Sequence, residues 1–296
     1  MKQAARISAA AVVLLVILAA VWLTLWRWRP QAPPVGCDWP QWRYDAGRTA
    51  ASPQMLPDEL HLQWGVRLPP QSPAWADPLN QDRMGYDLCY EPVVAGSTMF
   101  IPCAGSDKLL ALDSRTGQEK WRFYADGPVR LPAAVADGRV FFVSDDGYLY
   151  CLSADDGQLR WKFRGGPEEL RVLGNERLIS GWPARGGPVV ADGAVYFAAG
   201  IWPFMGVFIH ALDAQTGKLI WTQDGCSFNY IYQPHDSPAF SGPAPQGPLT
   251  VAGDRLLVPN GRATPACLDR ATGQFLYFRA ASSKSAGGAT VAAFGG

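Results

Sequence analysis

The chain has little of the material from which catalytic and metal sites are usually built. Its 296 residues include only three His and six Cys, and no two Cys are adjacent or form a Cys-x-x-Cys pair. The sequence also lacks a Gly-x-Ser-x-Gly elbow, a His-Glu-x-x-His motif, a P-loop and a Gly-x-Gly-x-x-Gly fingerprint. These absences give no support to an elbow-type hydrolase, a zincin or a nucleotide-binding domain.

An excess of charge is missing too. The chain holds 26 basic and 26 acidic side chains, which excludes a nucleic-acid binder that depends on a broad basic field. The balance is uneven along the chain, because residues 1–29 contain four basic side chains and no acid. The remainder therefore holds 22 basic and 26 acidic side chains, so a basic leader precedes a mildly acidic body.

The leader contains an uncharged and almost entirely apolar run, residues 7–26. As a helix this run would be about 30 Å long, which matches the hydrocarbon thickness of a bilayer. It is longer than the roughly 7–15 apolar residues of a signal peptide, and Trp22, Trp26 and Trp28 suit a membrane interface. The run predicts an uncleaved N-terminal transmembrane helix within residues 1–29, with a cleaved signal peptide as the alternative.

After residue 30 no convincing helical period appears, and a repeat organises the chain instead. Residues 111–121, Ala-Leu-Asp-Ser-Arg-Thr-Gly-Gln-Glu-Lys-Trp, recur as residues 211–221, and weaker copies occupy 151–161 and 267–277. Each copy predicts a short apolar strand, a Thr-Gly or Asp-Gly turn and a second strand that ends in a large aromatic residue. A further hairpin with a tight turn precedes each copy. One repeat is therefore predicted to be four antiparallel strands, A to D.

Units of four antiparallel strands, too small to bury their own faces, are typical of the blades of a β-propeller. The chain resembles the pyrroloquinoline-quinone (PQQ) repeat propellers, whose Ala-x-Asp-x-x-Thr-Gly-x-x-x-Trp motif is complete at 111–121 and 211–221. That group includes the BamB-type outer-membrane assembly lipoproteins and the quinoprotein alcohol dehydrogenases. The resemblance implies that the closing aromatic residues dock one blade on the next: Trp121, Trp161, Trp221 and, more loosely, Tyr277.

The predicted fold class is all-β, a β-propeller of four-stranded antiparallel blades preceded by one N-terminal transmembrane helix. Residues 1–29 are the expected membrane anchor, and residues 30–50 are a Pro-rich tether and the start of the propeller. The spacing of the closing aromatic residues indicates about five blades in residues 51–296. The resemblance implies a ring of seven or eight blades, so we expect a C-terminally incomplete propeller, with a closed five-bladed ring as the alternative.

The strand order also predicts where a binding site would lie. The A–B and C–D turns are short and share one face, while every long insertion falls on the other face: 65–91, 162–186, 199–206 and 222–246. Long loops on a rigid scaffold often carry binding sites, and Arg and aromatic residues are favoured anchors. The candidates are Arg130, Arg177, Trp182, Arg185, Trp202, Tyr232 and His235. In the alternative interpretation many of these side chains fold back as cores of the loops.

Single His and Cys residues are weaker signals. His61 and His210 fall in predicted strands and are expected to be structural. Cys89 and Cys103 flank the hairpin turn at Gly96-Ser97, and its expected register brings them within one step of each other. They are therefore candidates for a disulfide in an oxidising compartment.

Two functions remain open. The missing catalytic set favours a non-catalytic binding or assembly platform in the bacterial cell envelope. It would be tethered to the membrane through residues 7–26, with the propeller on the periplasmic side and a protein or other envelope component as partner. This reading requires no cofactor. The alternative, implied by the resemblance, is a fragment of a PQQ-dependent alcohol or sugar dehydrogenase, which would bind PQQ with Ca²⁺.

Overall fold

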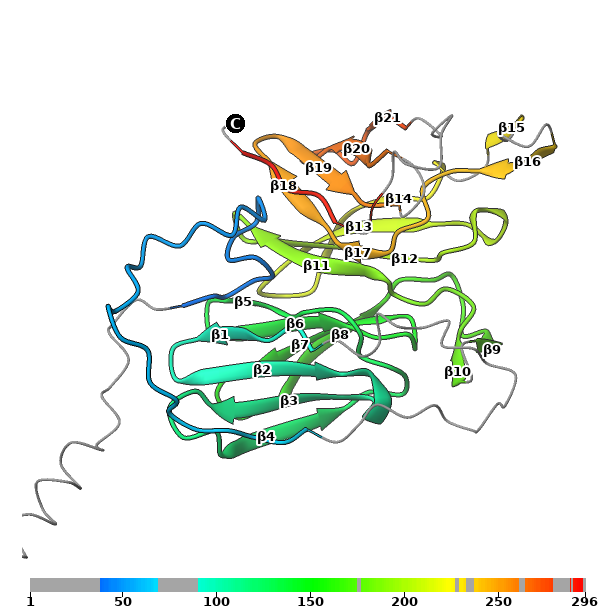
Figure 1. Ribbon diagram of the computed structural model, residues 1–296. Coiled ribbons are helices and arrows are strands. Elements are labelled where there is room, and N and C mark those ends of the chain that lie inside the picture. Colours follow the sequence, from blue (N-terminus) through cyan, green and yellow to red (C-terminus); the bar gives the residue numbers. More distant parts are fainter. Residues whose placement is uncertain are drawn as a thin grey trace, which may run out of the picture.

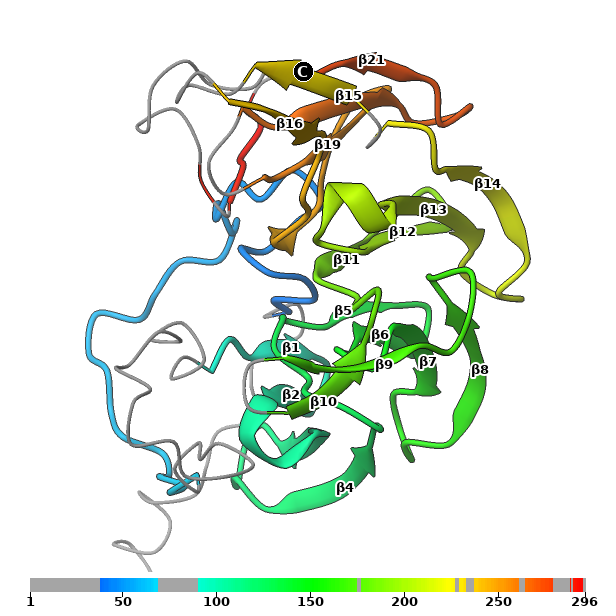
Figure 2. The same cartoon turned by 90° about the vertical axis from the view of Figure 1, so that its right-hand side faces the viewer.

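Four antiparallel sheets stand side by side in an arc in the computed structural model of the chain (Figure 1, Figure 2). The structure describes residues 38–68, 90–174, 177–226, 229–232, 237–260, 264–278, 288 and 290–294. The predicted anchor, Cys89 and His235 lie outside these residues. Among the residues described, no helix is long and apolar enough to cross a membrane. The all-β prediction is confirmed.

Each of these sheets contains four antiparallel strands in chain order, as the repeat predicts, and the third sheet has one additional strand. Blade 1 consists of β1 (Val93–Ala95), β2 (Thr98–Cys103), β3 (Lys108–Asp113) and β4 (Glu119–Tyr124). Blade 2 consists of β5 (Ala134–Ala136), β6 (Arg139–Val143), β7 (Tyr148–Ser153) and β8 (Leu159–Arg164). Blade 3 consists of β11 (Gly186–Ala191), β12 (Ala194–Ala199), β13 (Phe208–Asp213) and β14 (Leu219–Gln223). Blade 4 consists of β18 (Thr250–Ala252), β19 (Arg255–Val258), β20 (Ala266–Asp269) and β21 (Phe275–Tyr277).

The connections between blades contain further elements. A short strand, β17 (Gly247–Pro248), pairs with β11 in parallel. Two extra hairpins are formed by β9 (Arg171–Gly174) with β10 (Arg177–Ser180) and by β15 (Asn229–Tyr232) with β16 (Pro238–Ser241). Two 3₁₀ turns, η2 (Ala104–Ser106) and η3 (Pro203–Met205), complete the described elements.

The tight turns form where Asp and Gly predict them. In the β11–β12 turn, Asp192 and Gly193 have φ angles of 50° and 76°, which suits the type I′ geometry of a two-residue hairpin. In the β3–β4 turn, the Asp113 carboxylate accepts from the N–H groups of Arg115 and Thr116 at 3.0 and 2.8 Å. The motif therefore specifies its turn through local hydrogen bonds.

The two ends of the sheets differ. The A–B and C–D turns gather at one end, on the left in Figure 1, which we call the turn face. The B–C turns, the connections between blades and both extra hairpins lie at the other end, which we call the loop face. Figure 2 looks onto the loop face, with β9–β10 lying across blade 2 and β15–β16 near blade 4.

Tryptophan rings on the outer strands lie against glycines of the next blade. The ring of Trp121 covers Gly157 in the β7–β8 turn, where an added Cβ would stand 2.7 Å from the ring. The ring of Trp221 covers Gly273 in the β20–β21 turn at 2.5 Å. Any larger residue would push the blades apart. The Trp121 indole N–H also donates to the Ala154 carbonyl at 3.1 Å, so the Trp121 contact is both apolar and directional.

Trp64 and Trp161 make related contacts. Trp64, which precedes blade 1, covers Gly117 and donates to the Ser114 carbonyl at 3.0 Å. Trp161 covers Gly217 in blade 3, but its buried indole N–H has no hydrogen-bond acceptor. Tyr277 ends blade 4 with 56% of its surface exposed.

Apolar side chains fill the space between successive blades. Phe100, Leu109 and Val93 of blade 1 pack against Phe142 and Leu152 of blade 2 in one continuous cluster. Equivalent clusters join blade 2 to blade 3 and blade 3 to blade 4. The core is therefore divided into layers between sheets, which is how small blades bury their faces.

Residues 38–50, which we call the strap, cross the turn face and contact the inner strand of each blade. Each contact uses the penultimate residue of that strand. Trp39 exchanges two backbone hydrogen bonds with Val94, at 2.7 and 2.9 Å, and the Pro40 carbonyl accepts from Val135 at 2.8 Å. The Gln41 side-chain amide pairs with both backbone groups of Val190 at 3.0 Å, and the Ala46 carbonyl accepts from Val251 at 2.8 Å.

Arg48 fixes the far end of the strap between blades 3 and 4. Its guanidinium is fully buried and donates to the carbonyls of Leu249 at 2.9 Å and Pro188 at 3.0 Å. Burial lowers the pKa of Arg48 to about 9, although Asp45 acts in the opposite direction. Backbone carbonyls from two blades therefore take the place of water around the buried Arg48 guanidinium.

The two kinds of Trp contact can be separated by mutation. A Trp121→Phe variant should lose about 1 kcal/mol more free energy of unfolding than a Trp161→Phe variant, because only Trp121 gives up a hydrogen bond. Both changes remove the same ring area, so Trp161→Phe serves as the matched control. Urea unfolding of the two variants measures the difference, and equal losses would contradict the assigned geometry.

Candidate functional site

The predicted binding residues are divided between internal contacts and the surface. Arg130 and Arg185 come together on the carboxylate of Asp145. Arg130 Nε lies 2.7 Å from Asp145 Oδ2, and Arg185 reaches Oδ1 through Nε at 3.1 Å and Oδ2 through Nη2 at 2.8 Å. All three side chains are at least nine-tenths buried.

Asp145 stands in the short turn between β6 and β7, where backbone groups fix it as well. Its N–H donates to the Pro128 carbonyl at 2.9 Å, and its carbonyl accepts from Ser180 at 2.8 Å. Burial by itself would raise the pKa of Asp145, but Arg185 and Arg130 outweigh burial and hold the pKa below its ordinary value. One carboxylate therefore joins the connections on both sides of blade 2.

Arg177 carries out a similar task at longer range. Its Nη1 donates to both carboxylate oxygens of Asp107 at 2.8 Å, and its Nη2 donates to the Gly105 carbonyl at 2.7 Å. Burial raises the pKa of Asp107, and Arg177 offsets only part of that rise. The contact draws the β9–β10 hairpin across blade 2 to the η2 turn of blade 1.

The two predicted tryptophans also serve the loop structure. Trp182 is buried, donates from its indole N–H to the Met205 carbonyl at 2.7 Å and packs edge-on against Phe208. Trp202 caps the start of η3 and is half-buried. Trp182 therefore belongs to the packing beneath the loop face, as the alternative interpretation of the loop residues expects.

Large apolar side chains are exposed on the two hairpins of the loop face. Tyr232 in the β15–β16 hairpin has 76% of its surface exposed, and Leu173 in the β9–β10 hairpin has the same fraction exposed. Tyr230, Phe240 and Leu178 are exposed beside them on the same two hairpins. His235 falls outside the described residues, so its predicted role stays a prediction.

Several of these features have no signal in the sequence. Asp145 and Asp146 lie in the tight turn between β6 and β7, yet both are buried. Asp146 accepts from the Tyr150 hydroxyl at 2.6 Å. Nothing local to Asp107 distinguishes a carboxylate that pairs with an Arg 70 residues away.

The disulfide between Cys89 and Cys103 stays a prediction, because Cys89 lies outside the described residues. Cys103 is buried, and its Sγ donates to the Ile101 carbonyl at 3.6 Å. The hairpin has the expected register, with Ala95 opposite Thr98. However, the Cys103 side chain packs with Ile101 and Leu110 in an apolar cluster, and burial raises its pKa.

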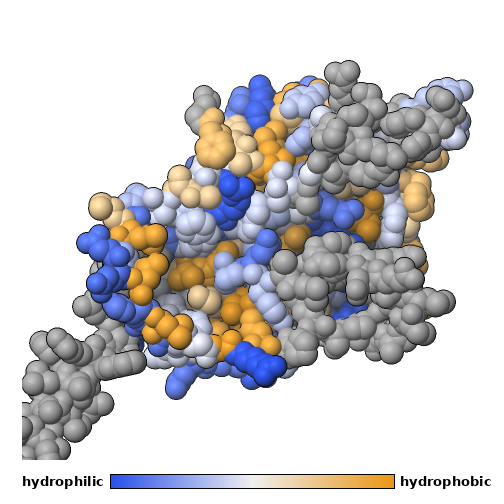
Figure 3. Space-filling view, in the orientation of Figure 1, coloured by the Kyte–Doolittle hydropathy of each residue, from blue (hydrophilic) through white to orange (hydrophobic). Residues whose placement is uncertain are grey.

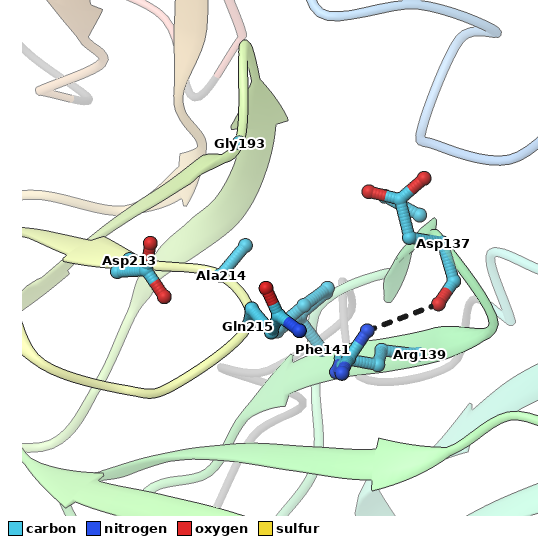
Figure 4. A pocket seen from close by; sticks show the side chains of 8 residues that line it. Asp137, Arg139, Phe141, Gly193, Asp213, Ala214 and Gln215 are labelled. Carbon is cyan, nitrogen blue, oxygen red and sulfur yellow. Dashed lines mark hydrogen bonds between the residues drawn. The ribbon is translucent and has the colours of Figure 1, made fainter.

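A pocket of about 280 Å³ lies on the turn face between blades 2 and 3 (Figure 4). Asp137 and Arg139 border it from blade 2, and Asp213 and Gln215 border it from blade 3. Arg139 donates to the backbone carbonyl of Asp137 at 3.1 Å. The pocket contains none of the predicted binding residues, so the two faces carry separate sets of polar groups.

The comparison with protein families decides the relationship. A model of the family described as outer membrane protein assembly factor BamB matches residues 61–194 and 205–293. The chain belongs to this family. The match covers all four blades and agrees with the resemblance to PQQ-repeat propellers.

Individual relatives of this BamB-family chain include enzymes. The dehydrogenase subunit of a quinone alcohol dehydrogenase from Gluconobacter oxydans is 32% identical over 145 residues, which is 44% of this chain and 18% of the relative. Tetrathionate hydrolase from Acidithiobacillus ferrooxidans is 28% identical over 163 residues, covering 52% of this chain and 29% of that enzyme. The chain thus spans about a fifth to a third of the length of these relatives.

A solved structure gives the same fold. The quinohemoprotein alcohol dehydrogenase ADHIIG from Pseudomonas putida HK5 aligns with a TM-score of 0.50 at 17% identity, over 66% of this chain and 34% of that one. At this identity the likeness speaks for the fold alone.

The described residues of this BamB-family chain do not fit the Ca²⁺ that accompanies PQQ. Calcium requires six to eight oxygen ligands, and no group of three His, Cys, Asp or Glu residues in the described part of the chain could hold a metal ion. Both oxygens of Asp145 already accept from arginines. We therefore derive no chemistry through this cofactor.

His210 is structural, as expected. Its Nδ1 lies 2.9 Å from the Thr222 hydroxyl, and its Nε2 lies 2.9 Å from the Gly165 carbonyl. Burial lowers the pKa of His210 to about 4, although the hydrogen bond to Gly165 acts in the opposite direction.

Removing the charge of Asp145 should be costly. An Asp145→Asn variant takes the shared carboxylate away from two buried guanidinium groups, so we expect a loss of about 3–5 kcal/mol in the free energy of unfolding at pH 7. Asp155→Asn, in an exposed turn of the same blade, is the matched control and should change little. Denaturant unfolding measures the free energy of unfolding of both variants. Equal losses would show that the ion pairs of Asp145 with Arg130 and Arg185 contribute nothing to stability.

His210 should make stability depend on pH. Its pKa is about 4 in the folded chain against 6.5 for the free side chain, so its contribution is complete above pH 6.5 and is lost as the pH falls towards 4. The loss should reach roughly 3 kcal/mol. A His210→Gln variant should flatten the stability curve over this range, whereas His61→Gln, at an exposed position, should not.

Proposed function

We propose that this BamB-family chain is a non-catalytic, membrane-tethered platform in the bacterial cell envelope that binds another envelope protein on its loop face. The observation that carries the proposal is the exposure of apolar side chains on the two extra hairpins. Leu173 and Leu178 project from β9–β10, and Tyr230, Tyr232 and Phe240 project from β15–β16. Soluble surfaces seldom expose such groups together unless they bind a partner.

The chemistry of these side chains suits a protein partner. Tyrosine and phenylalanine supply large contact areas at little cost in side-chain entropy, and tyrosine is enriched among the residues that dominate binding energy. Tyr230 and Phe240 already stack edge-to-face with ring centroids 5.2 Å apart. The aromatic surface is therefore partly pre-organised across the hairpin.

The arginines of the loop face support the β9–β10 hairpin from below. Because Arg130 and Arg185 bind Asp145 and Arg177 binds Asp107, the connection that carries this hairpin is held to blades 1 and 2. A binding surface on a supported loop loses less entropy when a partner docks. We assign these arginines to positioning, and the exposed apolar groups to contact.

The location rests on sequence and family together. Residues 7–26 have the length and composition of a membrane span. The family description refers to assembly of outer membrane proteins. Both agree with an envelope protein whose propeller lies on the periplasmic side.

The test uses paired substitutions in the full-length chain. Leu173→Ser and Tyr232→Ser should each weaken a stoichiometric complex with the partner by about tenfold or more, as expected for an anchor at an interface. Leu62→Ser and Tyr124→Ser change residues of the same type that are also exposed but lie off the hairpins, and they should leave the complex intact. Affinity purification from envelopes followed by a binding titration compares the four variants.

The proposal fails if the hairpin variants bind as well as the controls. Thermal unfolding must show all four variants folded, since exposed positions tolerate serine without loss of the core.

The similarity to the quinone alcohol dehydrogenase subunit favours a second candidate, a fragment of a PQQ-dependent dehydrogenase. Incubating the full-length chain with PQQ and Ca²⁺ should give no alcohol- or sugar-dependent dye reduction under the first proposal. Dye reduction that requires both additions would replace the platform with the enzyme.

A further inference from the structure

The strap fixes where the chain joins the propeller. Asp38 Oδ1 accepts from the N–H of Gly96 at 2.7 Å, and Gly96 lies in the β1–β2 turn. Trp39 then pairs with Val94 on the inner strand of blade 1. The chain therefore reaches the folded body on the turn face, beside the innermost strand and away from the outer strand β4.

We propose that the turn face is the membrane-proximal face of the protein and that both hairpins point away from the bilayer. The inference rests on the proposed tethering through residues 7–26. In this orientation a partner binds on the side of the propeller that is remote from the bilayer. The partner must therefore extend that far from the lipid surface.

The length of the tether supports this orientation. Residues 27–37 lie between the apolar run and the strap and can span at most about 40 Å, even if fully extended. A six-residue strand such as β2 is about 20 Å long, and the hairpins extend beyond the ends of the strands (Figure 1). Bringing the hairpins to the bilayer would require the tether to cover more than about 30 Å from the turn face, so most of it would have to be held extended, whereas the turn face reaches the bilayer with the tether relaxed.

The strap cannot lengthen the tether by detaching. Its hydrogen bonds reach the inner strands of all four blades, and the Gly47 carbonyl also accepts from Ala293 at 2.8 Å. Releasing it would withdraw Arg48 from the carbonyls of Leu249 and Pro188, and Gln41 from the backbone groups of Val190. Each lost hydrogen bond to a blade costs free energy. The point of attachment is therefore as fixed as the blades themselves.

The surface next to the strap has the character expected near lipid. The segment that follows the strap bows outward from the turn face, drawn in blue in Figure 1, and shows hydrophobic side chains between hydrophilic ones in Figure 3. Met55 and Leu56 are neighbours there, with 93% and 78% of their surfaces exposed. Apolar side chains exposed among polar ones suit contact with a membrane interface.

Energy transfer to the membrane tests the orientation. Met55→Cys on the turn-face side and Leu173→Cys on a hairpin are each labelled with a donor in the full-length chain, with Cys37 and Cys89 replaced by Ser. The other four Cys are buried and should not react in the folded protein. The chain is reconstituted in phosphatidylcholine vesicles that contain an acceptor-labelled lipid. Transfer should be clearly greater from position 55 than from position 173.

A second pair, Leu56→Cys and Tyr232→Cys, repeats the comparison at different exposed sites. If the vesicles float with the protein and transfer from 173 and 232 equals or exceeds that from 55 and 56, the orientation is wrong while the tether stands. If the protein does not float with vesicles, the tether itself is wrong, and the orientation falls with it.

Discussion

The contact of a tryptophan ring with a glycine turn is the constraint on which the arrangement of the sheets depends. A four-stranded sheet cannot bury both of its faces alone, so its stability comes from the next sheet. Trp121 and Trp221 set that distance, because Gly157 and Gly273 leave room for the ring and for nothing larger between them. The apolar layers between blades then fill at a fixed spacing.

Fixed blades allow long connections, and the loop face uses them in two ways. Beneath the surface, buried ion pairs centred on Asp145 and Asp107 hold connections from different blades together. Such pairs give specificity of arrangement more than net stability. Above them the β9–β10 and β15–β16 hairpins expose apolar side chains to solvent. On this face the buried ion pairs hold the loops in place, and the exposed apolar side chains are left to make contacts.

The opposite face is organised by a single segment. The strap forms hydrogen bonds with the penultimate residue of each inner strand. One stretch of chain therefore contacts equivalent positions in all four blades. Gln41 does this with a side chain, and Arg48 does it with a buried cation. Because the strap lies on the turn face, the residues that precede it in the chain approach the propeller from that face.

The blade follows from the local sequence. Strand order, the turns at Asp192–Gly193 and Asp113–Gly117, and the closing tryptophans depend on residues within a few positions of each other, where turn chemistry and strand pattern act locally. The fold is needed to bring Arg130 and Arg185 together on Asp145 and to bury Cys103 in an apolar cluster. Those partners are far apart in the chain or compete with alternatives of similar local preference, so their pairing depends on how the blades stack.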